Sequence, residues 1–94
     1  MNGITIEKVE FLTPVQNNAV LRLPGRTYPC IAIQGDSLSI LAERARSIRS
    51  RAEQLGDEQL LDEASDLQAL VDAIQDQYEH ALAAHQIDVP YRKT

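Results

Sequence analysis

The spacing of apolar positions changes near residue 35 and divides the chain into a strand-rich part and a helical part. Residues 4–12, 19–23 and 28–34 are rich in β-branched and aliphatic side chains, and residues 19–23 alternate between two faces. Strict alternation is typical of a strand with one buried face. These three segments are therefore predicted to be β-strands.

Turn residues separate the predicted strands. Pro24 and Gly25 suit the two central positions of a type II turn, because Pro sets φ for the first and Gly tolerates the positive φ of the second. Such short links favour an antiparallel meander. Cys30 shares a strand face with Tyr28 and Ala32 and is expected to be a small buried residue.

Helical spacing governs the remainder of the chain. Residues 37–55 and 58–85 each repeat apolar side chains at steps of three and four, which predicts two amphipathic helices. The first seam is Leu38, Leu41, Ala45, Ile48, Ala52 and Leu55; the second is Leu60, Ala64, Leu67, Val71, Ile74, Tyr78, Ala81 and His85. Gly56 between them suits a left-handed helix terminus, so the helices should form an antiparallel hairpin.

We therefore expect an α+β fold in a single domain over residues 1–94: a three-stranded antiparallel sheet followed by a two-helix hairpin packed on one face. A tail at 87–94 should pack back in extended form. The inner sheet residues Leu21, Leu23, Ile31 and Ile33 should meet the helical seams, and Ile48 and Leu67 should be core residues.

Composition limits the classes of partner. The net charge of −5 argues against binding to nucleic acid or to an anionic membrane. A single cysteine fits a reducing compartment, and the first residues lack the basic start and apolar run of a secretory signal. No stretch approaches the ~18 apolar residues of a membrane span. A cytoplasmic protein is the simplest expectation.

The strongest chemical feature is an acidic stripe on the second predicted helix. Nine carboxylates and no Lys or Arg lie between residues 57 and 88, and most of the acids share the side opposite the apolar seam. Like charges at i,i+4 oppose helix formation by roughly 0.2–0.5 kcal/mol per pair. The stripe is either a solvated face or a docking surface for a basic protein. The candidate partner-binding residues are Asp62, Asp66, Asp72, Asp76 and Glu79, with Arg22 and Arg26 as a second patch.

Arginines on the first predicted helix are expected to form ion pairs with only a few of these acids. Arg44, Arg49 and Arg51 flank its seam and could meet Glu63 or Asp57 across the hairpin, whereas Arg46 is expected to point outward.

Other chemistry has weak support in the sequence. Asp72, Asp76 and His80 have the spacing of metal ligands but include one nitrogen donor, so no metal site is expected. Cys30 lies in no recognisable nucleophile motif. Without a set of acid, base and nucleophile, the protein is expected to be non-enzymatic and to need no cofactor.

The segments RLPGR at Arg22–Arg26 and IQGDSLSIL at Ile33–Leu41, with Pro29 between them, resemble a small uncharacterised bacterial family. The resemblance implies a strand-rich front and a helical hairpin, and carries no activity. In size, charge and build the chain is also similar to immunity proteins, which neutralise bacterial toxins. This similarity implies a protein that binds a cognate toxin and occludes its active site. The alternative is a structural or regulatory module that forms a homodimer through Leu61, Tyr78 and Leu82 of its hairpin.

Overall fold

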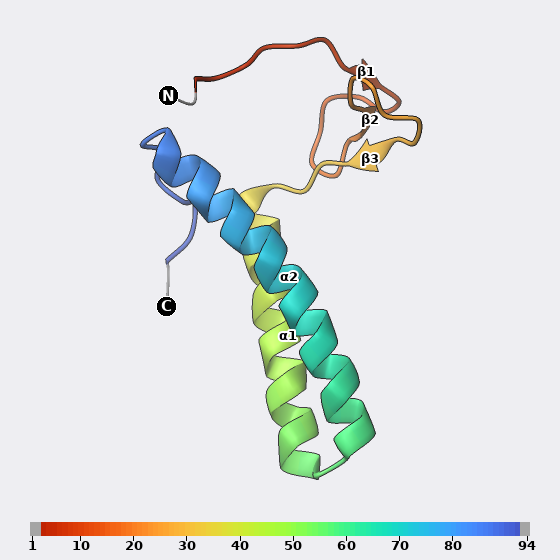
Figure 1. Cartoon of the computed structure of the whole chain (residues 1–94), viewed down its shortest axis with the longest axis vertical. Helices are drawn as coiled ribbons and strands as arrows, with labels where there is room; N and C mark the ends of the chain where they lie inside the picture. The colour runs from red at the N-terminus through yellow and green to blue at the C-terminus, as the bar shows by residue number, and fades with distance from the viewer. Residues whose placement is uncertain (1–2, 93–94) are drawn as a thin grey trace. The chain divides into compact units, whose positions relative to one another are not determined.

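The computed structural model describes residues 3–92, which contain three short strands followed by two long helices (Figure 1). This element order confirms the predicted α+β class. The sequence predicted one domain over residues 1–94; the structure forms two compact units, one ending at Gln34 and one beginning at Gly35. None of the helices in the described part of the chain is long and apolar enough to cross a membrane.

The first unit is an antiparallel sheet with the strand order β1-β2-β3. Its strands are β1 (Glu10–Phe11), β2 (Val20–Arg22) and β3 (Cys30–Ile31). Leu21 is the central residue, opposite Phe11 on one side and Cys30 on the other. The turn between β2 and β3 is confirmed, because Gly25 has a φ of 74° and the Arg26 N–H donates to the Leu23 carbonyl at 3.1 Å.

The strands are shorter than the segments 4–12, 19–23 and 28–34 that the sequence predicted. Side chains and prolines interrupt the ladder: the Thr13 hydroxyl accepts the Val20 N–H at 3.0 Å, and Pro24 and Pro29 have no N–H to donate. The prediction that Cys30 is buried is wrong, since this side chain is exposed.

The apolar residues assigned to the inner face of the sheet are also more open than predicted. Leu23, Ile31 and Ile33 are exposed, and Leu21 is partly buried. Among the described residues of this unit, Ala19 is buried, and its carbonyl accepts the Ala32 N–H at 2.9 Å. Strands of two or three residues cover little of their own apolar surface.

The second unit is the helical hairpin of α1 (Gly35–Leu55) and α2 (Glu58–Ala84), which pack side by side (Figure 1). Gly56 links them in the left-handed conformation, with a φ of 72°, as predicted. The Asp57 carboxylate then caps α2 by accepting the Leu60 N–H at 3.1 Å. At the far end Gln86, with a φ of 57°, turns the chain out of α2.

Small residues, chiefly Ala42, Ala45, Ala52 and Ala64, occupy the line where the helices meet, which we name the alanine seam. The buried apolar side chains of the hairpin are Leu38, Ala42, Ala45, Ala52 and Ala64. The prediction that Ile48 and Leu67 are core residues is wrong, because both are exposed, as are Leu41 and Leu55 of the predicted seam. Alanine lets two helix backbones approach closely, and the longer neighbouring side chains then lie beside the seam rather than in it.

Gly35 provides a test of this close packing. It is buried, and a methyl group in place of its hydrogen would overlap the ring and hydroxyl of Tyr78 on α2. Gly-to-Ala in an open helix gains up to about 1 kcal/mol. Gly35→Ala should instead lower the free energy of unfolding by about 1–3 kcal/mol through overpacking.

Urea denaturation would measure this loss, with the same substitution in a Tyr78→Leu background as the control. The account predicts that Gly35→Ala becomes neutral or stabilising once the ring is removed. An equal loss in both backgrounds would show that the Tyr78 ring does not lie against Gly35.

Candidate functional site

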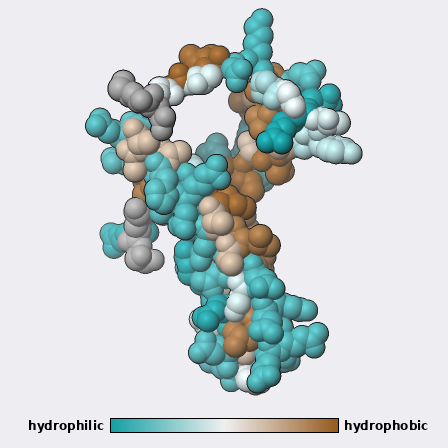
Figure 2. All heavy atoms as spheres, viewed as in Figure 1, coloured by the Kyte–Doolittle hydropathy of each residue, from teal (hydrophilic) through white to brown (hydrophobic). Residues whose placement is uncertain are grey.

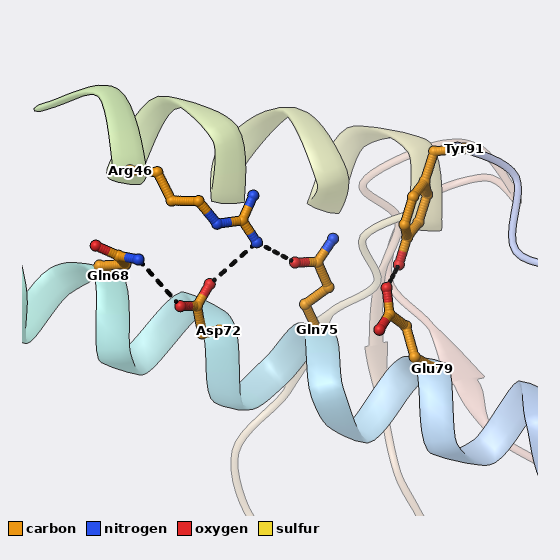
Figure 3. A network of polar contacts seen from close by, with 6 residues as sticks. All are labelled: Arg46, Gln68, Asp72, Gln75, Glu79 and Tyr91. Carbon is orange, nitrogen blue, oxygen red and sulfur yellow. Dashed lines mark hydrogen bonds and ion pairs between the residues drawn. The ribbon is translucent and has the colours of Figure 1, made fainter. Parts of the chain in front are cut away.

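A network of polar side chains joins the two helices along one face of the hairpin (Figure 3). Arg46 extends from α1 and donates to the Gln75 side-chain carbonyl at 2.9 Å and to the Asp72 carboxylate at 3.4 Å. Gln68, one turn before Asp72 on α2, donates to the other Asp72 oxygen at 3.3 Å. The expectation that Arg46 points outward is therefore wrong, because its long side chain folds back across the seam toward α2.

Gln75 is the buried polar residue of this network. It is 7% exposed, and its carbonyl oxygen is satisfied by the Arg46 guanidinium. A buried polar group without a partner would cost about 1–3 kcal/mol. The alanine seam contains no polar group that could select one alignment of the two helices. The hydrogen bond from Arg46 to Gln75 provides that selection.

The C-terminal tail joins the same face. The Tyr91 hydroxyl donates to the Glu79 carboxylate at 2.7 Å (Figure 3). The tail can reach back because the Ile87 N–H donates to the Leu82 carbonyl at 2.9 Å, closing a turn at the end of α2. The expectation that the tail packs back holds for Tyr91, and residues 93–94 lie outside the described residues.

Burial raises the pKa of Tyr91 above the ordinary value of 10.0, and the hydrogen bond to Glu79 raises it further. Ionisation would remove the donated proton and place two negative groups side by side. A side-chain hydrogen bond with Gln75 acts in the opposite direction and is the smaller effect. The net result is a tyrosine held in its neutral form.

These residues border a shallow groove of about 240 Å³ on the polar face. Its lining residues are Arg46, Asp72, Gln75, Asp76, Glu79, Tyr91 and Arg92. Such a groove offers hydrogen bonds and charges of both signs to a polar group presented by a partner.

The acids predicted to bind a partner differ in their surroundings. Asp62, Asp66 and Asp76 are exposed on α2, whereas Asp72 and Glu79 are partly buried and engaged by Arg46 and Tyr91. The structure brings Asp72, Asp76 and Glu79 together at the groove. Asp62 and Asp66 lie nearer the Gly56 end of the same helix.

The two arginines predicted as a second patch lie in the first unit. Arg22 in β2 pairs with Glu10 of β1, with 3.7 Å between nitrogen and oxygen. Arg26 follows the turn and lines an open hollow with Leu23 and Tyr28. They are accessible, but Arg22 already has an acidic neighbour.

The sequence did not single out Arg46, Gln68, Gln75, Tyr91 or Arg92 as site residues. The sequence carried little signal for these residues. Relative to the predicted seams, Arg46 points outward and Asp72 lies on the opposite side, and the position of Tyr91 depends on a return of the tail that periodicity does not encode.

The metal-like spacing of Asp72, Asp76 and His80 does not produce a ligand cluster. The Nδ1 atom of His80 lies 2.7 Å from the backbone carbonyl of Asp76 and so is committed to its own helix. Within residues 3–92 no group of three or more His, Cys, Asp or Glu side chains is placed to hold a metal ion.

The contact between Tyr91 and Glu79 should give the hairpin a distinct pH dependence. Because the pKa of Tyr91 is raised in the folded state, the stability it contributes is present below pH 10 and is lost as the pH rises through the folded-state pKa. Absorbance titration of tyrosinate, taken as the difference between the unmodified chain and Tyr91→Phe, should show Tyr91 ionising above the ordinary tyrosine value of 10.0.

Glu79→Gln should lower the pKa of Tyr91 toward the ordinary tyrosine value, and Tyr91→Phe should remove the high-pH loss of stability. An unshifted pKa of Tyr91 in the unmodified chain would mean that the tail does not contact α2.

Comparison with known proteins gives a family and no function. No curated protein and no solved structure matches the chain. A family model described as a family of unknown function, DUF6959, matches residues 4–91, which is nearly the whole sequence. The chain therefore belongs to the DUF6959 family.

Proposed function

We propose that this chain is an immunity-type binding protein that neutralises a cognate bacterial toxin by covering its active site. The observation that carries the proposal is the separation of charge between the helices. α2 contains eight carboxylates from its cap at Asp57 to Glu79 and no Lys or Arg, whereas the arginines of the hairpin helices belong to α1. A surface so biased attracts a basic partner and repels acidic ones.

The contacts within the hairpin divide the acids by role. Asp72 lies 3.4 Å from Arg46, so part of its charge is offset within the chain and its first role is to hold α1 against α2. Asp62, Asp66 and Asp76 are exposed and remain available to a partner. The proposed docking surface is therefore this exposed acidic face, with Glu79 and the groove at one end.

The proposed role requires no catalysis and no cofactor. Recognition of a basic surface needs acids held on a rigid element, and a capped helix packed against a second helix meets that need. Arg22 and Arg26 would add contacts of the opposite sign at the edge of the complex. We also propose that the protein carries out this role in the cytoplasm.

Charge reversal at exposed acids tests the proposal without disturbing the Arg46 network. Asp62→Lys combined with Asp76→Lys should fold normally but bind a toxin domain encoded beside this gene at least about 100-fold more weakly, since each close charge contact contributes on the order of 1.5 kcal/mol or more. Titration calorimetry would give the affinity, and survival of cells that express the toxin would give the protection.

Glu7→Lys combined with Glu43→Lys is the matched control, because it makes the same change in net charge at exposed residues outside α2. The control should bind and protect normally. If the α2 variant protects as well as the unmodified chain, or both variants lose binding equally, the acidic face is not the docking surface.

A further inference from the structure

Large apolar side chains line the hairpin beside the alanine seam. They recur at every seventh residue on both helices: Leu41, Ile48 and Leu55 on α1, and Leu60, Leu67 and Ile74 on α2. Their exposed fractions range from 37% at Leu60 to 74% at Leu55. Figure 2 shows hydrophobic side chains along the helical pair, flanked by hydrophilic ones. We name these six residues the apolar rows.

Both rows lie on the same face of the hairpin. The contact from Arg46 to Asp72 marks the polar face. Ile48 and Ile74 each follow one of these residues by two positions, which is about 200° around a helix. The remaining members of each row stand at multiples of seven from Ile48 or Ile74 and so share their side. The hairpin therefore has a polar face and an apolar face, with the alanine seam between them.

The spacing of the apolar rows suits a surface that is covered by other helices. A repeat of seven is the spacing by which one helix packs lengthwise along another, as in coiled coils and four-helix bundles. Two helices of about 20 residues make a face about 30 Å long and 20 Å wide, or about 600 Å². That approaches the roughly 800 Å² that each partner contributes to a standard-size interface.

Charges beside the rows make the face complementary to itself. Arg44 and Arg51 border the row on α1, and Glu63 borders the row on α2. The Arg49 side chain donates to Ser65 at 3.3 Å. Because the helices are antiparallel, Arg51, two residues after Arg49, then lies level with Glu63, two residues before Ser65. If two copies pack face to face about a two-fold axis parallel to the helices, α1 of each lies over α2 of the other and Arg51 meets Glu63. The other face-to-face arrangement would set α1 against α1 and bring like charges together.

We infer that a second copy of this chain docks on the apolar rows and completes a four-helix bundle. The residues that the sequence suggested for self-association, Leu61, Tyr78 and Leu82, are partly buried within their own hairpin. The polar face lies away from this interface, so the inference does not depend on the proposed function. Dimerisation would leave the groove of each copy accessible.

Sedimentation velocity of the full chain tests the inference directly. The unmodified chain should sediment at twice its mass of 10.5 kDa. Ile48→Glu combined with Leu67→Glu should raise the dimer dissociation constant at least about 100-fold, because it buries unpaired charge in the interface. Ser47→Glu combined with Ala73→Glu changes the charge equally at exposed positions away from the rows and should leave the dimer intact.

Circular dichroism on the same samples would verify that the helices persist. A monomeric unmodified chain overturns the inference, whether the rows are then covered by residues before Gly35 or by a different protein. A dimer that survives the Ile48 and Leu67 substitutions overturns it as well, since the copies must then associate through another surface.

Charge exchange tests the arrangement of the two copies. Arg51→Glu and Glu63→Arg should each weaken the dimer, by about tenfold for a close charge pair, and the two together should restore it. Restoration supports packing of α1 on the α2 of the other copy. Additive weakening overturns that arrangement.

Discussion

The close approach of α1 and α2 through alanine is the constraint on which the rest of the structure depends. Ala42, Ala45, Ala52 and Ala64 are almost completely buried, and among the described residues of the hairpin the large apolar side chain buried with them is Leu38. Small side chains allow tight contact between helix backbones but bury little apolar area per residue. The hairpin therefore depends on additional contacts at its margins, and the two margins have opposite chemistry.

On one margin Arg46, Asp72 and Gln75 form hydrogen bonds between the helices, and Tyr91 ties the tail to Glu79. On the other margin the apolar rows remain exposed. An exposed apolar face of this size usually marks an interaction surface. The proposed acidic docking surface and the proposed dimer interface thus use different faces, and one chain could carry both.

Periodicity predicted the elements better than it predicted their packing. Gly25 and Gly56 adopt the positive φ that their turns require, and Asp57 caps α2 as acids near a helix start should. The observed seam differs from the predicted one because Leu41, Ala45 and Ile48 all fit steps of three and four. Spacing alone therefore identifies only a broad arc of the helix surface. Side-chain size decides which part of that arc a neighbour can approach, and this is a tertiary property. The site was predicted in part: the acids lie on α2 as expected, but the partners of Asp72 and Glu79 come from α1 and the tail.

The most direct measurement of the alanine seam is the free energy of unfolding of Ala45→Leu compared with that of Ala73→Leu, which enlarges an exposed alanine on α2. If the helices meet closely at Ala45, that substitution should lose about 1–3 kcal/mol through overpacking while the exposed one stays within about 0.5 kcal/mol of the unmodified chain. Equal or greater stability of Ala45→Leu would show that the helices stand further apart and that larger side chains fill the space between them.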